Sequence, residues 1–397
     1  MSNVYRLEKN INRFYLFSFL QDLSFFTPIF VIFLQANQLS LEGIMILQSL
    51  YLLFNLLLEI PTGIIADKYG YKKSLIAGSF FCALGFMIFA VGNNFIDFLL
   101  AMIMYAIGAT LMSGADEAFL FETLKEMGRE IDYPKIFGRA RAVTVLGVTL
   151  ASIIGGYMAE YSMRATFILS AISLIFMFLI NLSLIEPKHI GSSNSLKELT
   201  GGVMKFVFSN SKIKWCISFF AFINLVIWGT YFLYQPYFQK LGIPIKYFGI
   251  IFAGLNIFVF FASIYFNKIK KYFSDTQIIY FMLTLTALPL LFVYGFFSIP
   301  FIAFFILHQV LRGFLSPFIS HLINSFVGSE NRATILSINN MFSRGIQFIF
   351  FPMIGFLANR LDIRNTFLIL FIFSIMVSFI ILIKFYGIFV RQKLIKT

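Results

Sequence analysis

The segment EIPTGIIADKYGYKKS, residues 59–74, lies between two long apolar runs and contains five charged residues, two glycines and one proline. The flanking runs are continuous and have the length, about 20 residues, that crosses the hydrocarbon core of a bilayer as a helix. They lack the alternation of apolar and polar residues that a membrane β-strand requires. We therefore interpret the segment as a short polar connection between two transmembrane helices.

The composition of the whole chain agrees with a membrane protein. Of 397 residues, 59% are apolar, 19% are aromatic and only 12% are charged, whereas soluble domains are about 25% charged. Cys82 and Cys216 lie in or next to apolar runs without a second ligand at metal-binding spacing, so we predict packing roles for them and no metal or cofactor. The polar N-terminus precedes an apolar run that is too long for a signal peptide, and we expect that run to remain as the first span.

The pattern of apolar runs predicts an all-α polytopic membrane protein with twelve transmembrane helices. The expected spans are residues 12–35, 41–66, 74–92, 97–122, 140–159, 164–186, 213–238, 246–267, 276–296, 298–323, 333–358 and 364–386.

The positive charge of the chain is distributed unevenly between the connections. If the N-terminus is cytoplasmic, 23 of the 31 lysines and arginines lie in cytoplasmic segments, five lie outside and three lie within spans. This asymmetry is the positive-inside signal, and it predicts an even number of spans with both termini in the cytoplasm. The net charge of +13 thus reflects topology, and we expect no nucleic-acid partner.

The longest polar interruption divides the expected spans six and six. We predict an N-terminal six-helix bundle at residues 1–186, a cytoplasmic linker at 187–212 and a C-terminal six-helix bundle at 213–397. Weak repeats support a duplication: the loop ADKYGYKKS has a short basic counterpart, NKIKKYFSD, and IGGYMAE in the fifth span resembles MIGFLAN in the eleventh. Two parallel six-helix repeats are an architecture of secondary transporters.

The opening segment resembles the signature G-x-x-x-D-[RK]-x-G-x-[RK]-[RK] between the second and third spans of the major facilitator superfamily, and EIPTG resembles a group of bacterial members. The matching residues are Gly63, Asp67, Lys68, Gly70, Lys72 and Lys73. The resemblance implies that these residues form a conformational latch on the cytoplasmic side, with Asp67 at its centre. For Lys72 and Lys73, a purely topological role is an equal alternative.

Two further motifs of the family are incomplete. The fourth span of many proton antiporters carries an arginine four residues before a glycine, and Met104 stands at that position when Gly108 is aligned. The exporter pattern of the fifth span, G-x-x-x-G-P-x-x-G-G, appears as GVTLASIIGG. It keeps three glycines that we assign to helix packing: Gly147, Gly155 and Gly156. The resemblance therefore suggests export without establishing it.

Ionisable residues inside a span are costly, so each is a functional hypothesis. Asp22 lies near the middle of the first span, and Asp116 and Glu117 lie in the cytoplasmic third of the fourth. Neighbouring residues of a helix point about 100° apart, so only one of Asp116 and Glu117 can face a cavity squarely. If Gly313 repeats Gly108, His321 is the counterpart of Asp116. These four ionisable residues are our candidates for proton coupling; simple hydrogen bonding or packing is the alternative for Asp22 and for the histidine.

Two polar and aromatic stripes predict the wall of a substrate cavity, because their members recur on one helix face. The first stripe, in the seventh span, consists of Asn224, Trp228, Tyr231 and Gln235. The second, in the eleventh span, consists of Asn340, Arg344 and Gln347, and Arg312 lies mid-span in the tenth. Few charges and many aromatic rings suit an amphipathic solute, while the two arginines leave an anionic substrate open.

No motif for ATP binding or hydrolysis is present, so we predict a transporter and not an enzyme. The first hypothesis is a proton-coupled exporter of drug-like or amphipathic molecules, working by alternating access as a monomer in a bacterial inner membrane. The alternatives are an uptake permease or a transporter of lipids or anionic metabolites on the same fold. A non-transporting receptor is the third possibility, since a fold does not fix a function.

Overall fold

The computed structural model describes residues 2–188, 206–207, 209–328 and 332–390. This part of the chain is helical and contains no β-strand. Eleven of its helical segments are long and apolar enough to cross a membrane, and a twelfth is assembled from shorter pieces near the N-terminus. The prediction of an all-α polytopic membrane protein is confirmed. The orientation of the termini stays a prediction, and most of the expected linker lies outside the described residues.

The chain forms two compact units. Unit 1 comprises Met1–Ser193 and Ile243–Ala253, and unit 2 comprises Asn194–Gly242 and Gly254–Thr397. The first part of one long helix, α11, thus belongs to unit 1 although the rest belongs to unit 2.

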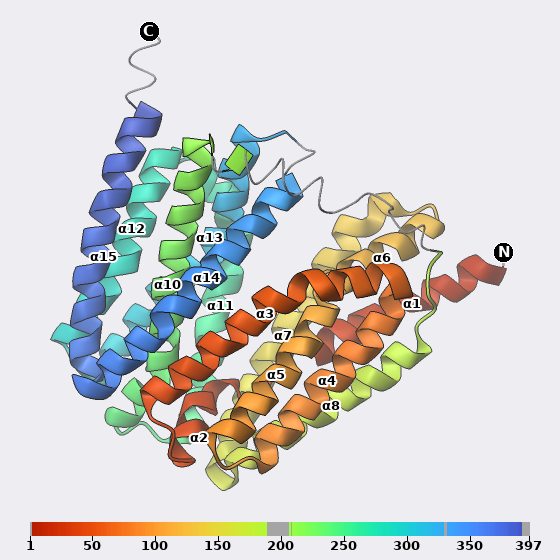
Figure 1. Cartoon of the computed structure of the whole chain (residues 1–397), viewed down its shortest axis with the longest axis horizontal. Coiled ribbons are helices and arrows are strands. Elements are labelled where there is room, and N and C mark those ends of the chain that lie inside the picture. The colour runs from red at the N-terminus through yellow and green to blue at the C-terminus, as the bar shows by residue number, and fades with distance from the viewer. Residues whose placement is uncertain (1, 189–205, 208, 329–331, 391–397) are drawn as a thin grey trace. The chain divides into compact units, whose positions relative to one another are not determined.

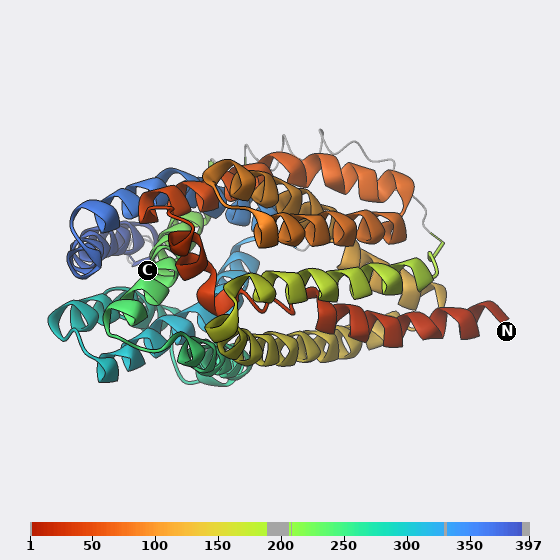
Figure 2. The ribbon, with the colours of Figure 1, turned by 90° about the horizontal axis from the view of Figure 1, so that it is seen from below.

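Unit 1 is a bundle in which α4 packs between α5 and α8, α3 covers α5, and α1 packs against α7 and α8 (Figure 1). Figure 2 shows α1 running alongside α8. The elements of unit 1 are α1 (Ser2–Gln21), η1 (Thr27–Ile29), α2 (Phe30–Ala36), α3 (Leu41–Tyr69), α4 (Tyr71–Val91), α5 (Phe95–Met112), α6 (Ala115–Glu126), η2 (Glu130–Asp132), α7 (Tyr133–Tyr161) and α8 (Met163–Ser183).

In unit 2, α10 packs against α13, α14 and α15, and α12 packs against α15 (Figure 1). Its elements are α10 (Ser211–Lys240), the part of α11 (Ile245–Lys270) from Gly254 onward, α12 (Asp275–Gly295), η3 (Ile299–Phe304), α13 (Phe305–Phe326), α14 (Arg332–Arg360), α15 (Ile363–Phe385) and the π-helical turn η5 (Tyr386–Val390).

Polar N-cap residues explain where several spans begin. Ser40, Asn94, Ser162 and Asn210 each accept hydrogen bonds from the first backbone N–H groups of α3, α5, α8 and α10. Ser274 begins α12 and forms a reciprocal capping box. These side chains satisfy donors that a helix leaves free at its N-terminus, so short polar residues between apolar runs determine the ends of the spans.

The first span differs from the prediction. We expect one continuous helix at residues 12–35, but the observed span is broken. It consists of α1, an irregular segment at residues 22–26, and the short pieces η1 and α2. Pro28 lacks a backbone N–H and disfavours helical geometry in the residue before it. Pro61, Pro236, Pro289, Pro317 and Pro352 nevertheless lie inside continuous helices, so proline alone does not explain the break.

Neighbouring helices satisfy the backbone that this break leaves free. The hydroxyl of Thr144 on α7 donates to the carbonyl of Ser18 at 3.0 Å, and the N–H of Phe25 donates to the hydroxyl of Ser170 on α8 at 3.0 Å. Irregular backbone inside a membrane is stable only where protein partners replace water. The break is therefore held by side chains more than 100 residues away in sequence.

The fourth span is also broken, between α5 and α6. Gly114 has a φ of +76°, a left-handed conformation that glycine adopts without steric cost. The carbonyls freed at the end of α5 accept hydrogen bonds from neighbouring helices: Thr62 of α3 donates to Thr110 at 3.1 Å, and Ser74 of α4 donates to Leu111 at 2.6 Å. Unit 1 thus contains two discontinuous spans.

An aromatic cluster anchors η1, α2 and the residues just before them. Phe33 contacts Phe167 with ring centroids 4.4 Å apart, and Phe26 stacks on the same ring at 4.8 Å. At the adjacent end of unit 1, Arg164 donates to the carbonyl of Ala90 at 2.6 Å and to the side chain of Asn93 at 2.6 Å. The ring contacts hold the short second part of the first span against α8, and Arg164 ties the neighbouring ends of α4 and α8 together.

Candidate functional site

The expected latch residues lie at the junction of α3 and α4. Gly70 ends α3 and begins α4 with a φ of +100°, so a residue with a side chain would be strained there. Asp67 is exposed in the last turn of α3 and accepts a hydrogen bond from the hydroxyl of Tyr71 at 3.5 Å. The two charged groups beside it, Lys68 and Lys73, are also exposed.

Gly63 lies on an exposed face of α3, and a Cβ atom there would meet nothing within 4 Å. In the part of the chain that the structure describes, Gly63 therefore does not serve a close approach of another helix.

Glu186 is a part of this junction that the sequence analysis missed. Its carboxylate accepts the backbone N–H of Tyr71 at 2.8 Å and that of Lys72 at 2.9 Å. It also lies 3.0 Å from the position of a Cβ at Gly70, so glycine makes room for it. A carboxylate on two free N–H groups at a helix N-terminus is a favourable electrostatic arrangement. No local signal reveals it, because more than 100 residues separate the partners.

We expect Glu186→Ala to destabilise unit 1. The substitution leaves two N–H groups of α4 without their acceptor, at a cost of about 0.5–2 kcal/mol, so the thermal unfolding midpoint of the purified protein should fall. Glu130→Ala is the matched control, because Glu130 is exposed in η2 and should leave the midpoint unchanged. Equal midpoints for both variants would contradict a capping role for Glu186.

Asp22 lies at the start of the irregular segment between α1 and η1, where it is half-buried. The hydroxyl of Ser173 on α8 approaches the carbonyl of Leu23 at 3.5 Å, so the neighbouring backbone is tied to the bundle. A carboxylate next to unwound backbone is a feature of ion sites in transporters with discontinuous helices.

Asp116 and Glu117 occupy the first turn of α6, immediately after the break of the fourth span. The side chain of Asp116 is buried, with 8% of its surface exposed, and its carboxylate accepts the N–H of Glu117 at 2.8 Å. Glu117 is half exposed and forms an ion pair with Arg141 of α7 at 3.0 Å. The two acids thus have different environments: one is inside the bundle and the other is neutralised at its surface.

Arg141 was counted in the sequence only as one of the basic residues that determine topology. In the structure it links α6 to α7 three residues before Thr144, which bonds to the broken first span. The sequence contains no signal for this ion pair, because the two partners belong to different helices.

His321 lies on α13 with an exposed ring, and its Nε2 is 3.3 Å from a carboxylate oxygen of Asp275. The same oxygen lies 3.1 Å from the ammonium group of Lys270. The ring therefore lies beside the Lys270–Asp275 ion pair at the ends of α11 and α12. His308, in contrast, is buried between the hydroxyl of Tyr234 and the carbonyl of Thr286, at 3.3 Å from each, which is a packing arrangement.

Three members of the stripe on α10 are less buried than most residues around them. Asn224, Trp228 and Tyr231 are half-buried, whereas most residues between them are buried. The rings of Trp228 and Tyr231 contact each other edge to face at 5.3 Å. The fourth member, Gln235, is buried.

Arg312 of α13 completes a cluster with this stripe. Its guanidinium carbon lies 5.5 Å from the ring centre of Trp228 and 5.8 Å from that of Tyr231, and its Nη2 donates to the side chain of Asn256 on α11 at 3.0 Å. We name Arg312, Trp228, Tyr231 and Asn256 the arginine–aromatic cluster. Cation–π contacts of this kind are attractive, especially where water is excluded. Asn256 was not predicted from sequence.

The side chains of the stripe on α14 become more buried along the helix. Asn340 is exposed, Arg344 is half-buried and Gln347 is buried. Packing between α10 and α14 includes the rings of Phe232 and Phe351 at 5.8 Å.

The three glycines of α7 lie at close helix contacts. A Cβ at Gly155 would overlap the carbonyl oxygen of Phe25, and one at Gly147 would lie 2.8 Å from the carbonyl oxygen of Phe19. A Cβ at Gly156 would lie 2.8 Å from the Cα of Gly249 on α11. The first two contacts are with the broken first span, so these small residues allow α7 to approach it.

These features define a class of protein. Discontinuous membrane helices that carry half-buried or buried carboxylates, together with a polar and aromatic cluster inside a second bundle, are suited to binding and moving a solute. Among the described residues, no group of three or more metal-ligating side chains occurs. The molecule is therefore organised as a membrane transporter.

The chain belongs to the major facilitator superfamily, whose family model matches residues 14–346. It is 25% identical over 350 residues to the uncharacterized MFS-type transporter YxaM of Bacillus subtilis (strain 168), covering 82% of this chain and 84% of that protein. It is 24% identical over 330 residues to the quinolone resistance protein NorA of Staphylococcus aureus, covering 79% and 82% respectively. The family and these relatives are transporters and not enzymes.

Solved structures agree on the fold. A variant of the nucleoside transporter NupG superposes with a TM-score of 0.82 at 16% identity, covering 94% of this chain and 99% of that one. A D-xylose–proton symporter superposes with a TM-score of 0.72 at 12% identity, covering 94% and 96%. Identities this low support the fold alone.

Proposed function

We propose that this chain is a proton-coupled exporter of drug-like or amphipathic small molecules that works by alternating access. The observation that carries the proposal is the arginine–aromatic cluster of unit 2. Its rings offer flat apolar surfaces, and its guanidinium and amide offer hydrogen bonds, so the cluster suits a solute with an aromatic body and a polar end.

Similarity to a quinolone resistance protein supports export of such compounds. Quinolones have a fused aromatic ring system and a carboxylate, which match the aromatic and cationic parts of the cluster. At 24% identity the substrate does not transfer directly, and the cluster itself is the basis for the proposal.

Coupling to protons rests on the carboxylates of unit 1. Asp116 is buried at the break of the fourth span, and Asp22 is half-buried at the break of the first. A carboxylate away from water favours its neutral form, so such a group can take up a proton in one state and release it in another.

The charge of unit 2 favours a second candidate, a transporter of anionic metabolites or lipids. Among the described residues, no carboxylate lies within ion-pair distance of Arg312. The described acidic residues of unit 2, Asp275 and Asp362, lie at helix ends. An arginine inside a membrane protein normally pairs with a counter-charge, and an anionic solute would supply one.

Substrate profiling of Arg312→Gln tests both candidates. The purified protein is reconstituted in liposomes with an imposed pH gradient and supplied with a fluorescent quinolone or with ethidium, a cation without a carboxylate. We expect the quinolone to bind about 10- to 100-fold more weakly to the variant, because a charge-assisted hydrogen bond is lost. Ethidium should be affected much less.

Three outcomes would contradict these expectations. Equal losses for both solutes would assign Arg312 a structural role. Transport of small organic anions without any aromatic solute would favour the second candidate. If no solute moves under any gradient, the chain is not an active transporter.

A further inference from the structure

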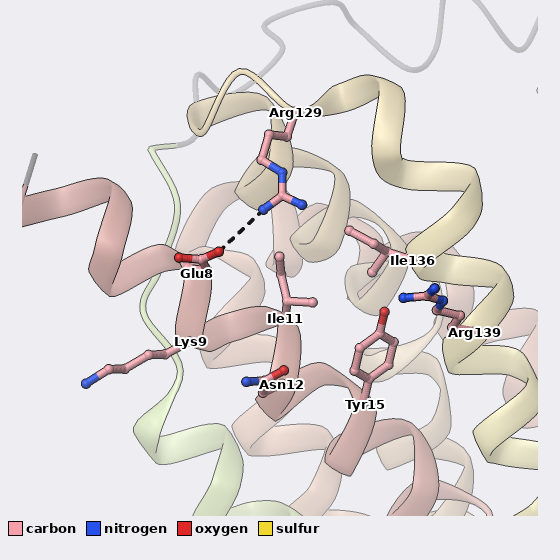
Figure 3. Close-up of a pocket in the computed structure, with 8 residues that line it drawn as sticks. All are labelled: Glu8, Lys9, Ile11, Asn12, Tyr15, Arg129, Ile136 and Arg139. Atoms are coloured by element: carbon pink, nitrogen blue, oxygen red, sulfur yellow. Dashed lines mark ion pairs between the residues drawn. The ribbon is translucent and has the colours of Figure 1, made fainter.

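A separate pocket lies in unit 1 between α1 on one side and Arg129 and the first turns of α7 on the other (Figure 3). Its volume is about 530 Å³. The lining residues are Glu8, Lys9, Ile11, Asn12, Tyr15, Arg129, Ile136 and Arg139. None of them belongs to the arginine–aromatic cluster or lies at the breaks of the first and fourth spans, so the transport proposal leaves this pocket without a role.

The charges of the pocket are only partly neutralised. Glu8 pairs with Arg129 at 3.6 Å, and the Nε of Arg129 also pairs with Asp132 at 2.8 Å. Among the described residues, no carboxylate lies within ion-pair distance of Arg139. In Figure 3 the guanidinium of Arg139 and the hydroxyl of Tyr15 lie together, while Lys9 points away. The pocket therefore presents hydrogen-bond donors and positive charge to a ligand.

The floor of the pocket is apolar, in contrast to its rim. Ile11 and Ile136 are buried, with 9% and 6% of their surfaces exposed, while Asn12 and Arg139 are exposed. Such a site accommodates a molecule that has both a charged group and an apolar part.

The position of the pocket along the helices indicates the level of a lipid headgroup. On α7, Arg139 lies three residues before the apolar sequence that starts at Ala142. On α1, Tyr15 is followed by Leu16, which has 48% of its surface exposed. Tyrosine and arginine are common at this boundary between water and hydrocarbon. The positive-inside rule assigns this end of unit 1 to the cytoplasm.

We propose that this pocket binds the phosphodiester headgroup of an anionic phospholipid, with Arg139 as its main anionic contact and Tyr15 as a second donor. A guanidinium donates two parallel hydrogen bonds to phosphate oxygens, and basic pockets between membrane helices on the cytoplasmic side are suited to such headgroups. The apolar floor would contact the glycerol and the first acyl carbons, which a soluble phosphate lacks.

Native mass spectrometry of the whole protein, with phosphatidylglycerol and phosphatidylcholine as competing probes, tests the proposal. We expect the wild type to retain phosphatidylglycerol preferentially. Arg139→Gln should weaken that binding about 10-fold, as expected for the loss of a charge-assisted hydrogen bond, and Tyr15→Phe should weaken it less. Lys135→Gln is the matched control: Lys135 is an exposed cation on the same helix, outside the lining of the pocket.

Each outcome is decisive. Loss of phosphatidylglycerol in Arg139→Gln with full retention in Lys135→Gln supports the site. Equal retention in all variants, or equal losses in Arg139→Gln and Lys135→Gln, would overturn it. Displacement of the lipid by glycerol phosphate at comparable concentration would identify a soluble phosphate as the ligand and overturn the lipid assignment. Unchanged thermal midpoints of the variants exclude unfolding as the cause.

Discussion

Replacing Asp116 with asparagine is expected to abolish solute movement driven by a pH gradient. Asp116 is buried in the first turn of α6, and asparagine preserves its size and its acceptor for the N–H of Glu117. The amide cannot bind and release a proton, so a proton gradient should no longer drive the transport cycle. Exchange of labelled for unlabelled solute across the membrane, which requires no net proton movement, should continue.

Glu117→Gln is the matched control for this prediction. It removes the neighbouring carboxylate, which is half exposed and already paired with Arg141, and it should reduce driven transport only modestly. The measurement is solute accumulation in proteoliposomes with and without a pH gradient. Full driven transport in Asp116→Asn would show that the proton is carried elsewhere, and Asp22→Asn would then be the next variant to measure.

Replacing Gly155 with alanine is expected to destabilise unit 1 strongly. The new Cβ would overlap the carbonyl oxygen of Phe25, and a backbone carbonyl in a packed segment cannot rotate away as a side chain can. Overpacking of this kind costs about 1–3 kcal/mol. The thermal unfolding midpoint should fall, and transport should fall with it, because the irregular segment that contains Asp22 would have to shift.

Gly138→Ala on the same helix is the control for Gly155→Ala. Gly138 is exposed and a Cβ there would meet nothing within 4 Å, so alanine should stabilise α7 by about 0.5–1 kcal/mol through its higher helix propensity. If both variants lower the midpoint equally, the close approach of α7 to the first span is not what makes Gly155 necessary.

The sequence was a good guide to the spans that are regular helices. Most expected boundaries lie within a few residues of the observed ones: residues 41–66 correspond to Leu41–Tyr69, and 164–186 correspond to Met163–Ser183. The two broken spans were expected as continuous helices. Their apolar composition suits either form, and the difference depends on hydroxyl groups of other helices that accept or donate to the freed backbone.

The same distinction applies to the candidate site: features of a single helix could be predicted from the sequence, whereas contacts between helices could not. Helical spacing placed Trp228 and Tyr231 on one face of α10, and their edge-to-face contact agrees with that spacing. Spacing within a helix says nothing about which residue of another helix meets that face. Asn256 beside Arg312, Arg141 beside Glu117 and Glu186 on the first turn of α4 were therefore not predicted.

By itself, the sequence determined that this protein is an all-helical membrane transporter of the major facilitator superfamily, because hydrophobic length and local motifs are properties of contiguous residues. Only the tertiary structure decided where the first and fourth spans break, which acid of the Asp116–Glu117 pair is buried, and what surrounds Arg312. Those features arise from groups on different helices, and in a membrane such groups must satisfy one another because lipid cannot. The segment at residues 59–74 illustrates this difference. Its motif can be read from the sequence, whereas the tertiary structure brings Glu186 to the N-terminus of α4 as a capping residue.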